Sequence, residues 1–254
     1  MSRRKKRAPK KSRRALGSEL HPQTTKGPKR KIAERYRGTI LLLSFVAVAS
    51  FFHLYSSNIP DLDSFYYSRL AWIYRTRGPF DVDFPWAQYS ASKTFSSSLW
   101  YGIGLFLVPF TYFNNLVIGI KLAGVVLTAA ALWIYYSAIK ISLLKPASLW
   151  PFLFFFSAAN VTAQFLMVRP QIISLPLSAL LFSLLIRRSE ITDGPEFSYA
   201  TASLTPIFLT SFGIAWFHLN FVWLPVVITC VVVVVRFIVE KKWTWLARWL
   251  SWAA

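Results

Sequence analysis

Apolar residues recur along this chain in runs that approach or reach the length of a membrane span, separated by short polar connections. A transmembrane helix needs about 20 predominantly apolar residues. Six runs are candidates, of which the fifth is short: 38–55, 116–136, 149–167, 172–186, 207–217 and 221–239. The pattern predicts an all-α fold, a polytopic transmembrane helical bundle with about six spans within residues 38–240.

Two further apolar segments fit a span less well. Residues 99–113 form a run shorter than a bilayer requires. Residues 241–254 place several Trp beside Lys and Arg, which suits a helix that lies in the membrane interface. The second segment is therefore expected to be an interfacial helix or the start of a further one.

Charge is concentrated at the N-terminus. Residues 1–37 hold 15 of the 29 Lys and Arg and two acidic residues, so they carry +13 of the net charge of +19. This stretch is polar, rich in Pro and without apolar periodicity, and it is expected to be a disordered tail. It is too long for the basic region of a cleavable signal peptide. Its position predicts a multi-pass protein of the cytoplasmic (plasma) membrane with the N-terminus in the cytoplasm.

The same tail has predicted partners. Basic clusters beside a membrane helix attract anionic lipid headgroups, by roughly 1 kcal/mol for each Lys or Arg near the surface. Such clusters also bind nucleic acid without sequence specificity, and no specific nucleic-acid partner is predicted. The alternative is a solvated tail whose charge only fixes the orientation of the protein.

Orientation decides what residues 99–113 do. If they crossed the membrane, the basic residues of every later loop would lie outside, against the positive-inside rule: Lys140, Lys145, Arg187, Arg188, Arg236, Lys241 and Lys242. If residues 99–113 lie along the outer surface, all of these residues lie inside. We therefore expect an outer loop at 57–98 and two surface helices, at 62–77 and 99–113. The outer face then gathers six polar residues: Asp61, Asp63, Arg69, Arg169, His218 and Asn220.

The outer loop begins with a short amphipathic pattern that ends at Gly78 and Pro79. Asp63 lies at or near the start of this predicted helix, where the helix dipole favours a carboxylate. A purely structural role for Asp63 as the helix cap is one alternative, and Asp61 is then a solvated turn residue. The aromatic residues of the loop fit an interfacial belt as well as a surface on which sugars stack.

The sequence D-L-D-S-F-Y-Y-S-R-L-A, followed by a Gly and then F-P-W, resembles the first outer loop of bacterial GT-C-type glycosyltransferase-like membrane proteins. In that class an acidic residue after the first helix is followed by an aromatic about four residues on and a small residue about eight on. Asp63, Tyr67 and Ala71 match this spacing. V-R-P-Q at 168–171 and W-F-H-L-N at 216–220 are also similar, and the resemblance extends over roughly residues 40–240.

The resemblance implies a GT-C-like N-terminal module with juxtamembrane helices in the first outer loop. It also implies a function, the transfer of a sugar from a polyprenyl-phosphate carrier to an acceptor on the extracytoplasmic side. Membrane lipids, including a polyprenyl-phosphate sugar, are the implied partners. No cofactor is identified beyond a candidate divalent cation, Mg²⁺ or Mn²⁺, bound by oxygen ligands.

Roles for individual residues follow from that reaction. Asp63 is the expected base for the acceptor hydroxyl, with Asp61 assisting, or the two carboxylates together hold the cation. Arg69 or Arg169 is expected to bind the carrier phosphate. Arg169 lies between two apolar runs, where an ionisable group is costly, and its alternative role is an interfacial anchor.

Two more residues are candidates for binding phosphate, each with a structural alternative. His218 falls in a tight turn between spans, where a polar side chain also serves to satisfy the backbone. Lys121 lies early in a span and can extend toward the surface as a snorkelling anchor. Cys230 is the only cysteine, so the chain has no intrachain disulfide or multi-cysteine metal site.

Departures from the GT-C pattern keep other functions open. Proteins of that class are usually much longer, so the chain is expected to be a fragment or a reduced member. The His that often follows F-P-W in related sequences is replaced here by S-S-S-L-W-Y-G-I-G. The alternatives are a noncatalytic membrane scaffold with a basic recruiting tail and a transporter or flippase-like protein. The charges sit mainly at span ends and no broken-helix repeat is evident in the sequence, which disfavours transport.

Overall fold

The computed structural model describes residues 28–55, 59, 61–80, 100–192 and 204–240, and within these ranges the regular structure is helical. Residues 1–27 of the basic tail, the F-P-W sequence and the Trp-rich segment 241–254 lie outside the described residues. The chain divides into two units, Met1–Thr39 and Ile40–Ala254. The helices that pack together belong to the second unit.

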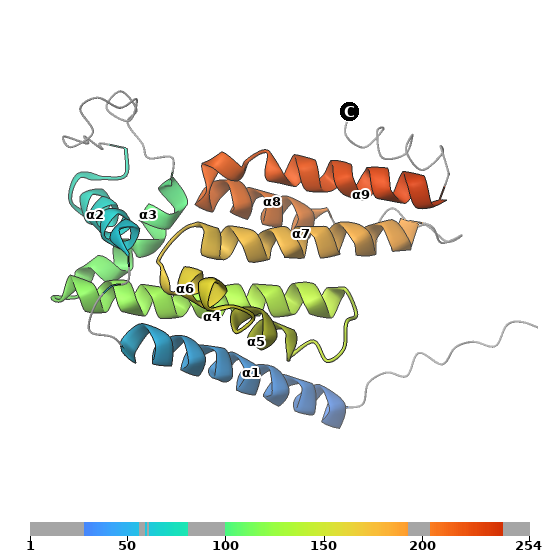
Figure 1. Cartoon of the computed structure of the whole chain (residues 1–254), viewed down its shortest axis with the longest axis horizontal. Helices are drawn as coiled ribbons and strands as arrows, with labels where there is room; N and C mark the ends of the chain where they lie inside the picture. The colour runs from blue at the N-terminus through green and yellow to red at the C-terminus, as the bar shows by residue number, and fades with distance from the viewer. Residues whose placement is uncertain (1–27, 56–58, 60, 81–99, 193–203, 241–254) are drawn as a thin grey trace, which may run out of the picture. The chain divides into compact units, whose positions relative to one another are not determined.

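The longer helices of that unit are α1 (Pro28–Tyr55), which belongs to it from Ile40 on, α4 (Leu116–Ile141), α7 (Gln171–Thr192), α8 (Thr205–Phe217) and α9 (Leu224–Glu240), as Figure 1 shows. Helices α1 and α8 end, and α4, α7 and α9 begin, at the end of the bundle where α2 (Leu62–Arg77) and α3 (Tyr101–Leu107) lie. We refer to this end as the α2 end. Because α1 ends and α4 begins at this same end, the two helices between them, α2 and α3, do not run the length of the bundle.

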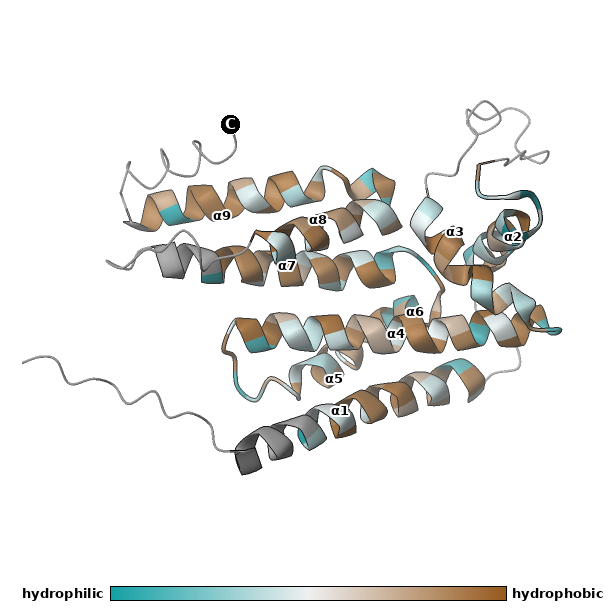
Figure 2. Ribbon diagram, turned by 180° about the vertical axis from the view of Figure 1, so that it is seen from behind, coloured by the Kyte–Doolittle hydropathy of each residue, from teal (hydrophilic) through white to brown (hydrophobic). Residues whose placement is uncertain are grey.

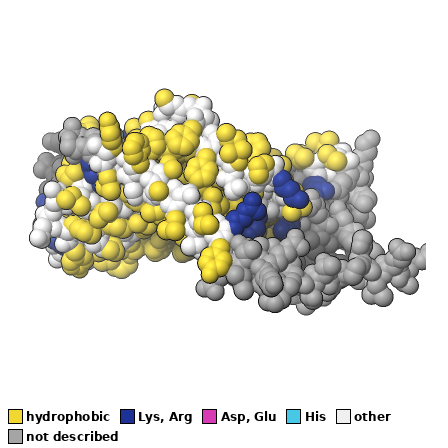
Figure 3. All heavy atoms as spheres, turned by 90° about the horizontal axis from the view of Figure 1, so that it is seen from below, with side chains coloured by type: hydrophobic (Ala, Val, Ile, Leu, Met, Phe, Trp, Pro, Cys, Tyr) yellow, Lys and Arg dark blue, Asp and Glu magenta, His cyan; other side chains and the backbone are white. Residues whose placement is uncertain are grey.

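Three helices of the described chain are long and apolar enough to cross a membrane: Tyr36–Tyr55, Leu116–Ile141 and Leu219–Val239. The number rises to four if α6 (Ala159–Leu166) and α7, which meet at a bend of 114°, form one broken span. Hydrophobic residues dominate these helices and the visible face of the molecule (Figures 2 and 3). Such helices indicate a membrane protein, with fewer clear spans than the six that the sequence predicts.

Part of the difference lies in α8, whose 13 residues are short for a span. The rest lies in residues 149–167, which were expected to form one span separate from 172–186. The chain instead forms α5 (Trp150–Phe155), a break, and then α6. The hydroxyl of Ser157 donates to the Phe154 carbonyl, and that of Thr162 donates to the Phe155 carbonyl. These carbonyls would accept backbone N–H groups in a continuing helix, so the two hydroxyls stabilise the break.

Helices form at the two positions where surface helices were expected. Helix α2 (Leu62–Arg77) has the predicted bounds, and α3 (Tyr101–Leu107) continues into the 3-10 helix η3 (Val108–Tyr112). A backbone φ of +90° at Gly78 ends α2, a conformation that glycine adopts without strain. From α3 to η3 the helical stretch rises about 18 Å at 1.5 Å per residue, well short of a bilayer. Helices α2 and α3 pack on each other through Leu70, Ile73 and Tyr74.

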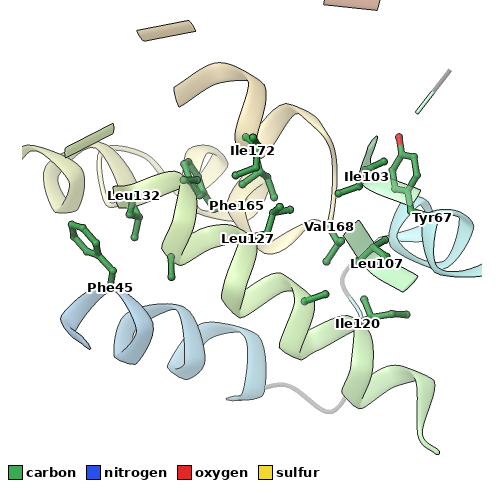
Figure 4. Packing of buried hydrophobic residues seen from close by; sticks show 14 of the residues in the cluster. Phe45, Tyr67, Ile103, Leu107, Ile120, Leu127, Leu132, Phe165, Val168 and Ile172 are labelled. Atoms are coloured by element: carbon green, nitrogen blue, oxygen red, sulfur yellow. The ribbon is translucent and has the colours of Figure 1, made fainter. Parts of the chain in front are cut away.

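The main core surrounds α4 (Figure 4). Phe45 of α1, Leu127 of α4 and Phe165 of α6 are buried together, and the same cluster continues to Tyr67 of α2 and Ile103 of α3. The core therefore joins the helices of the bundle to the two helices at the α2 end. This packing fixes the side chains of α2 against the connection between α6 and α7.

Candidate functional site

Asp61 caps helix α2. One carboxylate oxygen, Oδ1, accepts the backbone N–H of Ser64 at 2.7 Å, and Oδ2 accepts the Ser64 hydroxyl at 2.7 Å. An N-cap carboxylate satisfies N–H groups that have no partner within the helix. The alternative in which Asp63 caps the helix and Asp61 is a solvated turn residue is therefore wrong, although Asp63 does lie in the first turn.

Ser64 connects this cap to a distant part of the chain. Its side chain is fully buried, and its hydroxyl oxygen accepts the backbone N–H of Val168 at 2.9 Å. Val168 lies in the turn between α6 and α7, and it is itself buried. One serine thus joins the Asp61 cap to the α6–α7 turn.

The next residue of the turn forms an ion pair with the same helix. Arg169 Nε lies 3.1 Å from Asp63 Oδ2. The Asp63 side chain is 52% exposed and the Arg169 side chain 27% exposed. The pair therefore reaches the surface at the α2 end, where another molecule has access to the carboxylate.

Tyr67 lies one helical turn after Asp63 and is buried. Burial, followed by the negative charge of Asp63, raises the pKa of the Tyr67 phenol, so this side chain stays neutral at physiological pH. Its ring lies edge-to-face against Trp100, with centroids 5.9 Å apart. Ala71, the third residue of the GT-C-like spacing, is completely buried. Of the three matched residues, Asp63 alone is exposed.

The other predicted phosphate-binding residues have different neighbours. The Arg69 guanidinium carbon lies 4.1 Å from the centroid of the Trp72 ring, a cation–π arrangement. His218 is buried and stacks on Phe221 with ring centroids 4.0 Å apart. Burial lowers the pKa of His218, so it is uncharged at neutral pH and lacks the positive charge that would attract phosphate.

Lys121 also differs from its expected position. It is buried in α4 rather than extended toward the surface, and it lies close enough to His53 of α1 to act on it electrostatically. The structure therefore brings Asp63 and Arg169 together, while Arg69, His218 and Lys121 contact other residues. Arg169 is the predicted cation that meets the predicted base.

The two carboxylates do not form a convincing metal site. Both Asp61 oxygens accept hydrogen bonds from Ser64, and Asp63 is paired with Arg169. A protein-bound Mg²⁺ or Mn²⁺ needs several oxygen ligands directed at one point. Within the described ranges, no group of three or more His, Cys, Asp or Glu side chains is placed to hold a metal.

Ser64 is a functional candidate that the sequence interpretation missed. A signal was present, because Ser follows Asp61 by three residues, the spacing at which an N-cap side chain meets a backbone N–H. The contact of Ser64 with Val168 had no such signal, since the two residues are far apart in sequence. The same holds for Thr128, which lies within the apolar run of α4 and hydrogen-bonds α6.

Comparison with known proteins finds no relative. No protein-family model, no curated protein and no solved structure matches the chain.

Proposed function

We propose that this protein is a GT-C-like membrane glycosyltransferase, which moves a sugar from a polyprenyl-phosphate carrier to an acceptor on the extracytoplasmic side. The observation that supports the proposal best is the pair of Asp63 and Arg169. It combines a half-exposed carboxylate with a cation at the end of the apolar helices. A lipid-linked sugar phosphate presents its reacting bond at this level of a membrane.

The two charges suit the two halves of the reaction. Asp63 accepts the proton of the acceptor hydroxyl as the hydroxyl oxygen forms a bond to the anomeric carbon of the sugar. The bond between that carbon and the phosphate oxygen breaks, and the lipid phosphate leaves with the electron pair. Arg169 stabilises the negative charge that develops on the phosphate.

Asp63 is a better base than Asp61 on structural grounds. Both Asp61 oxygens are engaged by Ser64 within the fold. Asp63 is half-exposed and pairs with Arg169 through Oδ2. Tyr67 stays neutral beside it and adds no competing negative charge.

A transporter or flippase-like function is the second candidate, and one observation favours it. The break between α5 and α6 and the 114° bend between α6 and α7 form a discontinuous helical segment within the bundle. Transporters commonly use such segments to bind substrates near the membrane midplane. Arg169 and Asp63 lie instead at the α2 end, which fits chemistry at the membrane surface better than passage across it.

The proposal is tested by replacing Asp63→Asn in the full chain in the native host and measuring surface glycans and polyprenyl-phosphate sugars by mass spectrometry. We expect the transferred glycan to fall by about 100-fold, the lower range of a general base's contribution, and the lipid-linked sugar to accumulate. Asp61→Asn is the matched control, because Asn caps a helix about as well as Asp, and it should change output by less than about threefold. An unchanged amount of transferred glycan in the Asp63→Asn strain would contradict the proposed enzymatic function.

A further inference from the structure

A buried polar group in the interior of the bundle holds the C-terminal end of α6. Thr128 of α4 is completely buried, and its hydroxyl donates to the Phe165 carbonyl at 2.9 Å. His53 Nε2 of α1 lies 3.0 Å from the Thr128 oxygen. Because the single hydroxyl proton is used on Phe165, the Thr128 oxygen accepts and His53 donates. Three helices thus meet in one short hydrogen-bonded series.

The fold makes room for this arrangement. His53 is buried, and its ring occupies the space beside Gly124, where a Cβ atom would lie 2.4 Å from His53 Cε1. Lys121, one turn earlier on α4, is buried near the same ring. Burying a polar side chain inside an apolar bundle costs free energy unless the side chain forms hydrogen bonds. Buried polar residues in such a bundle are therefore more often functional than exposed ones.

The Phe165 carbonyl needs such a partner. Helix α6 ends at Leu166, and the last carbonyls of a helix have no N–H within the helix to accept. Three residues after Phe165, the Val168 N–H is bound by Ser64 of α2. The α6–α7 turn is therefore fixed on both sides, from the bundle interior by Thr128 and from the α2 end by Ser64. Figure 4 shows Phe165 and Val168 within the same packed core.

We propose that His53 and Thr128 are positioning residues, which fix the end of α6 so that Arg169 stays against Asp63. They act through the backbone of the turn and do not touch the ion pair. The inference rests on the proposed function for the chemical use of that pair, but the placement of residue 169 can be measured without it.

The test measures how readily position 169 reacts with a water-soluble maleimide in membranes containing the full chain. The parent carries Cys230→Ala, which removes the natural cysteine, and Arg169→Cys. Adding Thr128→Val should raise the labelling rate about tenfold, the factor that corresponds to losing one buried hydrogen bond. Thr128→Ser keeps the hydroxyl and should restore the parent rate. Gly124→Ala displaces the His53 ring without altering Thr128 and should also raise the rate.

Thr210→Val is the matched control. Thr210 is buried to a similar degree, but its hydroxyl donates to the Pro206 carbonyl of its own helix, α8. Labelling should stay at the parent rate in this variant. Equal rates in Thr128→Val, Thr128→Ser and the parent would overturn the inference. An equal rise in Thr210→Val would do the same, because it would mean that any lost buried hydroxyl loosens the turn.

The outcomes separate this inference from the proposed function. If labelling responds to Thr128 as expected and Asp63→Asn leaves the glycans unchanged, the turn is positioned as inferred but the enzyme proposal fails. If Asp63→Asn abolishes transfer and labelling ignores Thr128, the enzyme proposal stands and the positioning role fails.

Discussion

Two turns lie at the α2 end and look alike in sequence, since each places a basic residue between apolar helices. In the α6–α7 turn, Val168 and Arg169 are bound by residues of α2. In the α8–α9 connection, His218 stacks on its neighbour Phe221, and its Nδ1 has no hydrogen-bond partner among the described residues. The comparison shows that a polar residue at a span end becomes a strong functional candidate when a distant segment supplies its partner.

The two turns also differ in what surrounds them. Val168 is almost completely buried, whereas Leu219, Val222 and Trp223 beside His218 are exposed. An exposed apolar turn at the end of apolar helices suits contact with lipid. The α6–α7 turn is instead held against α2, where Ser64 binds Val168 and Asp63 pairs with Arg169. We therefore expect substitutions in the two turns to have unequal effects on sugar transfer.

The largest effect should come from Arg169→Ala. Removing the cation that stabilises the leaving phosphate should lower sugar transfer by about 100-fold, as for other groups that stabilise transition-state charge. Glycan output in the native host measures it. His218→Ala, the equivalent change in the other turn, should alter output by less than about threefold, because a buried neutral imidazole does not bind phosphate by charge. A comparable loss of glycan output in both variants would show that the α6–α7 turn is no more important for transfer than the α8–α9 connection.

An intermediate effect is expected on stability when the link between α2 and the α6–α7 turn is cut. Ser64→Ala leaves the Val168 N–H buried without its acceptor, which should cost about 2 kcal/mol. The free energy of unfolding in mixed detergent micelles measures this cost. Ser157→Ala is the control, since Ser157 is exposed and the Phe154 carbonyl that accepts its hydroxyl also accepts its backbone N–H. It should change stability by less than about 0.5 kcal/mol, and equal losses would show that Ser64 holds nothing specific.

How far sequence predicts this fold depends on whether an element is determined locally. Helix α2 was predicted to the residue, because its amphipathic pattern and Gly78 are local signals. Residues 149–167 were not, because composition alone does not show that hydroxyls compete for the carbonyls of Phe154 and Phe155.

The candidate site likewise combines features that local sequence predicts with features that depend on contacts between distant residues. Charge patterning predicted that Asp63 and Arg169 lie on one face of the membrane, but their 3.1 Å contact depends on the packing of α2 against the α6–α7 turn. Which aspartate caps α2 was also open in the sequence, since either residue is a good N-cap. Thr128 carried no signal, because its partners are in other helices and a lone threonine in an apolar run is common.

The smallest expected effect concerns the contact between α3 and α8. Helix α3 packs on α2, which holds the α6–α7 turn, so this contact connects the two turns. A Cβ atom at Gly102 of α3 would lie 2.3 Å from the Trp216 carbonyl oxygen of α8, so Gly102 allows the two backbones to approach closely. Tyr101 packs edge-on against the Trp216 ring at the same contact, with centroids 5.2 Å apart. Gly102→Ala should push α3 away from α8 and cost about 1 kcal/mol, the lower range for overpacking, because α3 is short and can shift.

Gly213→Ala in α8 is the matched control. The new Cβ would meet only the end of the Leu177 side chain, at 3.1 Å, which can move aside. Alanine also favours a helix over glycine by up to about 1 kcal/mol, so this variant should unfold at the same or a slightly higher detergent concentration than the parent. If Gly102→Ala is as well tolerated as Gly213→Ala, then α3 is not held against α8, and the two turns are independent. If Gly102→Ala is destabilising and also lowers sugar transfer, then the α8–α9 side contributes to the site through α3 rather than through His218.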